Sequence, residues 1–67
     1  RRESRLWAYP VVIKNVYFEN IRLENVCFED IRFVNSKFKG CKIIDSDLAK
    51  AEFKDVIFED MAFSTMI

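Results

Sequence analysis

The 67-residue chain contains no histidine, only one glycine and only one proline. Without histidine, a His-dependent catalytic triad, an imidazole proton relay and an imidazole metal ligand are excluded. One glycine does not provide the glycine-rich loop that surrounds a phosphate group. Aspartate and glutamate are numerous, but they recur with the repeat described below, as solvated side chains do. We therefore expect no catalytic residue, no enzymatic activity and no cofactor.

The sequence also lacks an excess of charge of either sign and lacks a long apolar run. Eleven basic and eleven acidic side chains give a net charge of zero. This balance argues against nonspecific nucleic-acid binding and against a polybasic membrane patch. No apolar run is long enough to insert across a bilayer, and no signal-peptide pattern is present. The chain does not begin with Met, so we interpret it as a processed product or a fragment, and no compartment is predicted.

What the sequence does contain is an uninterrupted five-residue repeat. From residue 11 to residue 65 its blocks are VVIKN, VYFEN, IRLEN, VCFED, IRFVN, SKFKG, CKIID, SDLAK, AEFKD, VIFED and MAFST. The third place is always large and apolar, the first place is apolar or small, and the fifth place is mostly Asn or Asp. The repeat is therefore the feature that must determine the fold.

A period of five excludes the two simplest regular structures. In an α-helix, five residues advance about 500°, so the large side chains would drift by ~140° per block and form no stripe. In a long strand, an odd period would place successive large residues on opposite faces. A three-residue strand with places one and three pointing inward satisfies the pattern, provided that the chain turns at places four and five. Asn, Asp and Gly40 at the fifth place tolerate the dihedral angles of turns. The repeat therefore predicts a β-solenoid.

The pentads SKFKG, CKIID, SDLAK and AEFKD resemble those of the pentapeptide-repeat family, in which a small residue lies two positions before a central Phe or Leu. The resemblance covers residues 11–65 and implies an all-β fold, the right-handed quadrilateral β-helix, with just under three coils of about twenty residues. Ile21, Ile31 and Met61 depart from the family by being larger than its usual side chain. The style of the repeat is also similar to that of the luminal domain of synaptic vesicle glycoprotein 2.

Three regions are expected along the chain. Residues 1–10 do not fit the repeat, and we expect Leu6, Trp7 and Tyr9 to cover the first coil as an N-terminal cap. Residues 11–65 form the β-helix, and residues 66–67 are a C-terminal tail. An alternative interpretation of the first segment is a partner-binding patch of Trp, Tyr and Arg side chains.

Stacked coils would bring together residues that are twenty apart. Four inward ladders are predicted: Ile13, Phe33 and Phe53; Phe18, Phe38 and Phe58; Leu23, Ile43 and Phe63; and Phe28 with Leu48. On the outside, Glu19, Lys39 and Glu59 would alternate in sign, and Arg32 would lie beside Glu52. Aromatic stacking along the ladders should stabilise the coils.

Several apolar residues are candidates for contact with a protein partner. Outward places hold Tyr17 and Ile57 on one side of the solenoid and Val12, Val34 and Ile44 elsewhere, although scattered exposed apolar residues are common. At the end of the chain, Met66 and Ile67 come after Phe63, and the sequence shows no polar capping helix. We expect an open strand edge there, which a partner or a second copy in a homodimer would complete. Trp7 and Tyr9 complete the set of candidates.

Disulfide and metal chemistry receive little support from the sequence. Cys41 is predicted to point inward and Cys27 outward on another side, so a bridge between them is geometrically disfavoured. A corner pair such as Asn35 and Asp55 has oxygen ligands for a cation, but the spacing of a calcium-binding loop is absent. We expect no metal site.

Three functions remain open. The first is a non-enzymatic protein-interaction or structural module, including a luminal domain of the kind that botulinum neurotoxin captures through strand edges, as the narrower similarity implies. The second is the DNA-mimic inhibition of type II topoisomerases by other pentapeptide-repeat proteins. That role requires a long, strongly acidic rod, whereas this chain is short and neutral. The third is a designed repeat protein or binder.

Overall fold

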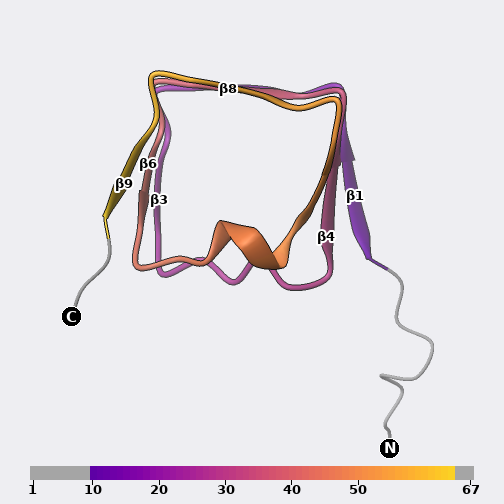
Figure 1. Cartoon of the computed structure of the whole chain (residues 1–67), viewed down its shortest axis with the longest axis horizontal. Coiled ribbons are helices and arrows are strands. Elements are labelled where there is room, and N and C mark those ends of the chain that lie inside the picture. The colour runs from indigo at the N-terminus through magenta and orange to yellow at the C-terminus, as the bar shows by residue number, and fades with distance from the viewer. Residues whose placement is uncertain (1–9, 65–67) are drawn as a thin grey trace, which may run out of the picture.

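The computed structural model describes residues 10–64, which form a square coil (Figure 1). Its strands are β1 (Val11–Lys14), β2 (Tyr17–Glu19), β3 (Arg22–Glu24), β4 (Ile31–Val34), β5 (Lys37–Lys39), β6 (Lys42–Ile44), β7 (Glu52–Lys54), β8 (Ile57–Glu59) and β9 (Ala62–Ser64). A short 3₁₀ helix, η2, spans Leu48–Lys50. The described residues therefore form an almost all-β structure.

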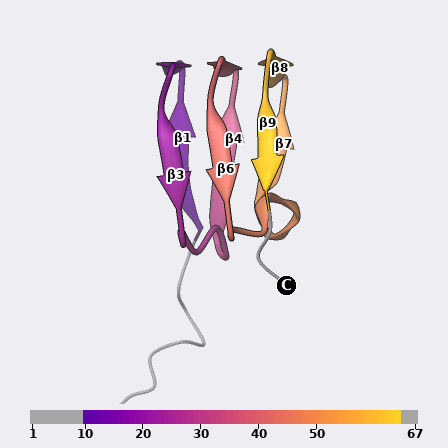
Figure 2. The same ribbon diagram turned by 90° about the vertical axis from the view of Figure 1, so that its left-hand side faces the viewer.

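The strands make three parallel sheets, each of which contains one strand from every coil. The strand orders are β1-β4-β7, β2-β5-β8 and β3-β6-β9. Cα partners are twenty residues apart, as in the ladder of Phe18, Phe38 and Phe58. Figure 2 shows the coils as successive layers. This register confirms the predicted β-helix and its twenty-residue coil, and it continues past the large side chains of Ile31 and Met61 without a shift.

The square outline arises at the fifth place of the repeat. Nine of the ten fifth-place residues between Asn15 and Asp60 have a positive φ, between 50° and 65°. This left-handed conformation is unfavourable for most L-residues, but Asn, Asp and glycine adopt it readily. The exception is Lys50, which is also the only one of the ten that is not Asn, Asp or Gly. The identity of the fifth residue therefore explains where the chain turns.

The fourth side of the square differs from the expectation that every pentad contains a strand. Residues 26–30 contain a turn, and residues 46–50 contain η2 (Figure 1, lower side). The side chain of Asp47 accepts a hydrogen bond from the Ala49 amide and caps this helix. Because Lys50 does not take the left-handed turn, this pentad closes as a helical turn. Residues 26–30 therefore have no strand in the next coil to pair with, and the strand prediction is wrong on this side.

The core occupies the inside of the square and is formed mainly by the middle coil. The buried side chains are Phe28, Phe33, Phe38, Cys41 and Ile43, together with Ser36. Rings stack along the predicted ladders, with centroids 4.5 Å apart for Phe18 and Phe38 and 5.4 Å apart for Phe33 and Phe53. Phe33 and Phe38 meet edge to face across the core. These stacked and T-shaped contacts confirm the predicted aromatic stacking.

Small polar residues at the first place join the coils at the corners. The Ser36 hydroxyl accepts a hydrogen bond from the Val16 amide and donates one to the Val34 carbonyl. Ser46 makes the same pair of bonds with Val26 and Ile44. Each hydroxyl therefore satisfies a backbone amide at a position where the strand ladder is interrupted.

Replacement of Gly40 tests the role of the corners. A Cβ atom at this position would collide with the side-chain oxygen of Asn20, and the φ of +65° is itself unfavourable for alanine. We expect Gly40→Ala to lower the free energy of unfolding by ~1–2 kcal/mol or more. The matched variant Lys50→Ala lies at the one fifth place between Asn15 and Asp60 that has no positive φ, so its effect should stay within about 0.5 kcal/mol. Urea denaturation followed by circular dichroism would measure both, and equal effects would contradict this account of the corners.

Candidate protein-interaction surface

The third coil presents three strand edges, one from each of the three sheets. In each sheet the last strand, β7, β8 or β9, pairs on one side only among residues 10–64. These strands form the outermost layer in Figure 2. We define the C-terminal face as the free edges of β7, β8 and β9 together with the side chains of Phe53, Phe58 and Phe63.

Position in the stack decides how exposed an inward side chain is. In the middle coil, Phe33, Phe38 and Ile43 are 3%, 0% and 1% exposed. Their partners in the third coil, Phe53, Phe58 and Phe63, are 36%, 41% and 62% exposed. The inward place is the same, but a neighbouring coil covers each of these three rings on one side only. The C-terminal face therefore combines aromatic surface with backbone edges, and such edges readily pair with another chain.

The first coil presents a second face at the other end of the solenoid. There β1, β2 and β3 each pair on one side only among the described residues. Val11 and Ile21 are exposed on this coil, as are the outward side chains of Val12 and Tyr17. The predicted cap, including Trp7 and Tyr9, lies outside the described residues.

One side of the solenoid brings together Tyr17, Lys37 and Ile57 in a single ladder. Tyr17 and Ile57 are exposed, as predicted. The Lys37 ammonium separates them, 5.9 Å from the centre of the Tyr17 ring and 2.9 Å from Glu59 Oε1. This side is therefore an alternation of apolar and charged groups, not a continuous apolar patch.

The Lys37–Glu59 pair shifts both ionisation equilibria. The hydrogen bond to Glu59 and the charge of that carboxylate raise the pKa of Lys37. The hydrogen bond from Lys37 and its positive charge, with a smaller effect of Lys39, lower the pKa of Glu59. A lowered carboxyl pKa stabilises the fold above the pKa of the unfolded chain, and this stabilisation is lost as the pH falls through the folded value. The raised lysine pKa gives a stabilisation that is lost as the pH rises through its folded value.

A glutamine at position 59 tests this pair. We expect Glu59→Gln to be less stable than the parent chain near neutral pH, because the ion pair is missing. The difference in unfolding free energy should disappear as the pH falls below the ordinary range of a glutamate, and it should also shrink in 1 M salt. Chemical denaturation at several pH values measures it, and a difference that stays constant down to low pH would show that the pair does not stabilise the fold.

The structure places the other predicted candidates differently. Phe63 is exposed, as expected. Val34 and Ile44, which the sequence predicts at outward places, are half-buried and so offer less surface to a partner than Tyr17 and Ile57. Both lie in the middle coil, where strands on either side cover them. Met66 and Ile67 lie outside the described residues.

Two exposed aromatic residues of the C-terminal face were not among the sequence-based candidates. Phe53 and Phe58 occupy inward places, and inward places predict burial. The signal that identifies them is their position in the last coil of the repeat. The place within the pentad and the number of the coil, taken together, therefore predict all three phenylalanines of the C-terminal face.

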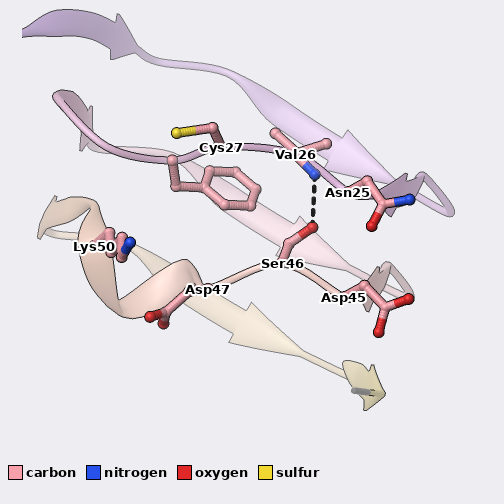
Figure 3. Close-up of a pocket in the computed structure, with 8 residues that line it drawn as sticks. Asn25, Val26, Cys27, Asp45, Ser46, Asp47 and Lys50 are labelled. Carbon is pink, nitrogen blue, oxygen red and sulfur yellow. Dashed lines mark hydrogen bonds between the residues drawn. The ribbon is translucent and has the colours of Figure 1, made fainter. Parts of the chain in front are cut away.

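A hollow with both polar and apolar lining residues lies beside the fourth side of the square (Figure 3). It is lined by Asn25, Val26, Cys27, Phe28, Asp45, Ser46, Asp47 and Lys50. The Val26 amide donates to Ser46 Oγ at 2.8 Å. Cys27 is exposed and Cys41 is buried, and both are free thiols, as the sequence predicted.

The corners and outward ladders do not favour a metal site or a nucleic-acid mimic. Asn35 donates from its amide to Asn15 Oδ1 at 2.7 Å. Within residues 10–64, no group of three or more acidic or cysteine side chains could hold a metal ion. In the same range, no three-coil ladder is acidic in all three coils. The continuous negative stripe that DNA mimicry requires is therefore not found among these residues.

Comparison with known proteins identifies the repeat. The family model described as "Pentapeptide repeat region" matches residues 11–66. Neither the curated proteins nor the solved structures give a match. Among the described residues, no helix is long and apolar enough to cross a membrane. The twenty-residue register and the family match agree, and the chain belongs to the pentapeptide-repeat family.

Proposed function

We propose that this chain is a non-enzymatic protein-binding module that pairs with strand edges of a partner through its C-terminal face. Membership of the pentapeptide-repeat family supports a structural or protein-interaction role. The observation that supports the proposal most directly is the exposure of Phe53, Phe58 and Phe63 beside three free strand edges.

A partner strand can extend the existing ladders at this face. The strands of the middle coil already pair in parallel with β7, β8 and β9 and place an apolar side chain over each phenylalanine. A strand on the free side would form backbone hydrogen bonds of the same kind and would cover the exposed ring surface. Backbone pairing would provide affinity, and the inward side chains would provide selectivity.

The scaffold suits this role because its edges are held in fixed positions. The coils are joined by ladder hydrogen bonds and by corner bonds such as the 2.9 Å bond from the Gly40 amide to the Glu59 carbonyl. The three free edges are therefore aligned before a partner arrives, which reduces the entropy lost on binding.

A peptide with the sequence of residues 31–44 is a suitable probe of the C-terminal face. It contains the three strands that stack on β7, β8 and β9 within the chain. We expect it to bind the 67-residue chain, and we expect Phe63→Ser to weaken binding by about tenfold or more, since covering an aromatic ring is worth ~1.5–3 kcal/mol. Fluorescence anisotropy of the labelled peptide measures the dissociation constant.

The control is Val12→Ser, which also replaces an exposed apolar residue by serine but lies on the outer side of β1. It should leave the dissociation constant unchanged. Absence of binding, or an equal loss in both variants, would contradict the proposed role of the C-terminal face.

A further inference from the structure

The net charge alternates in sign from coil to coil. In residues 11–30, two basic side chains and four acidic ones give −2. In residues 31–50, five basic side chains and two acidic ones give +3. In residues 51–64, Glu52, Asp55, Glu59 and Asp60 outweigh Lys54 and give −3. Although the net charge of the chain is zero, the solenoid therefore has a basic coil between two acidic coils.

Ion pairs join the basic coil to the third coil. Arg32 Nε lies 2.7 Å from Glu52 Oε1, and Lys37 Nζ lies 2.9 Å from Glu59 Oε1. The carboxylate side chains of Glu52 and Glu59 remain 66% and 45% exposed. They stand on outward places of β7 and β8, the strands whose other edges belong to the C-terminal face. A strand added there would lie about 4.8 Å from them, within reach of a Lys or Arg side chain.

We propose that the C-terminal face selects a basic strand edge, with Lys or Arg at the outward places opposite Glu52 and Glu59 and apolar residues at the inward places. This inference rests on the proposed function and specifies the chemistry of the partner. The middle coil shows that such a strand fits, because it satisfies both requirements on the opposite edge of the same strands.

The same charges disfavour a second copy as the partner. Head-to-tail stacking in continued register would place Glu19 of one copy opposite Glu59 of the other, and Lys14 opposite Lys54. Like charges directly opposite each other in a sheet are destabilising. Head-to-head stacking would bring two third coils together, each with a net charge of −3. Open strand edges commonly avoid self-association through charge of this kind.

Two peptides of equal length test the inference. The first has the sequence of residues 31–44, whose charged residues are Arg32, Lys37, Lys39 and Lys42. In the second, these four residues are replaced by glutamate (R32E, K37E, K39E and K42E) and the inward residues are unchanged. At low ionic strength we expect the acidic peptide to bind the 67-residue chain at least about tenfold more weakly. Because salt screens exposed charges, the ratio should fall toward one at 0.5 M salt.

The possible outcomes separate the two proposals. Equal binding of both peptides, with Phe63→Ser weakening each of them, would overturn the charge selection and leave the C-terminal face intact as a binding surface. If neither peptide binds, the proposed function fails, and the selection fails with it. Light scattering of the 67-residue chain alone is the last measurement. If its molar mass in solution increases with concentration at low salt, the chain associates with itself, and the inference that charge disfavours a second copy is overturned.

Discussion

The left-handed backbone turn at nine of the ten fifth places between Asn15 and Asp60 is the constraint on which the rest of the structure depends. Each turn requires a residue that tolerates positive φ, and Asn, Asp or Gly provides it at nine positions. Four sides complete a coil of twenty residues, so equivalent places stack directly on one another. The aromatic ladders, the hydroxyl bonds at the corners and the outward ion pairs all follow from this register.

The surface proposed for binding is a consequence of the same register. In the middle coil an inward phenylalanine is buried between two coils, as Phe38 is, whereas Phe53 and Phe58 of the third coil are exposed. In the third coil the same place becomes aromatic surface beside a free strand edge. Outward carboxylates and basic groups alternate along the stack, so a surface with apolar attraction also acquires charge selectivity. Inward side chains therefore stabilise the core where a coil lies on both sides of them. In the third coil, which among residues 10–64 has a neighbouring coil on one side only, the same places form the surface proposed for binding.

Much of the fold could be predicted from the sequence, because the period of five leaves few alternatives. The ladder of Phe18, Phe38 and Phe58 and the contact between Arg32 and Glu52 are as the pattern predicted. The fourth side could not be predicted from the period alone, because the Asp47 cap is a local hydrogen bond. The sequence feature that indicates the change on this side is Lys50, which takes a fifth place where the other pentads between residues 11 and 60 have Asn, Asp or Gly. The exposure of Phe53 and Phe58 depends on position in the stack, which a pattern of inward and outward places does not record.

The stacking register is tested most directly by nuclear Overhauser contacts between backbone and ring protons in solution. The twenty-residue coil predicts contacts between residues twenty apart, such as Phe33 with Phe53 and Phe38 with Phe58, on the three sides that contain strands. Helical short-range contacts are expected at residues 48–50. Contacts at a different, regular separation would contradict the twenty-residue coil and, with it, the C-terminal face.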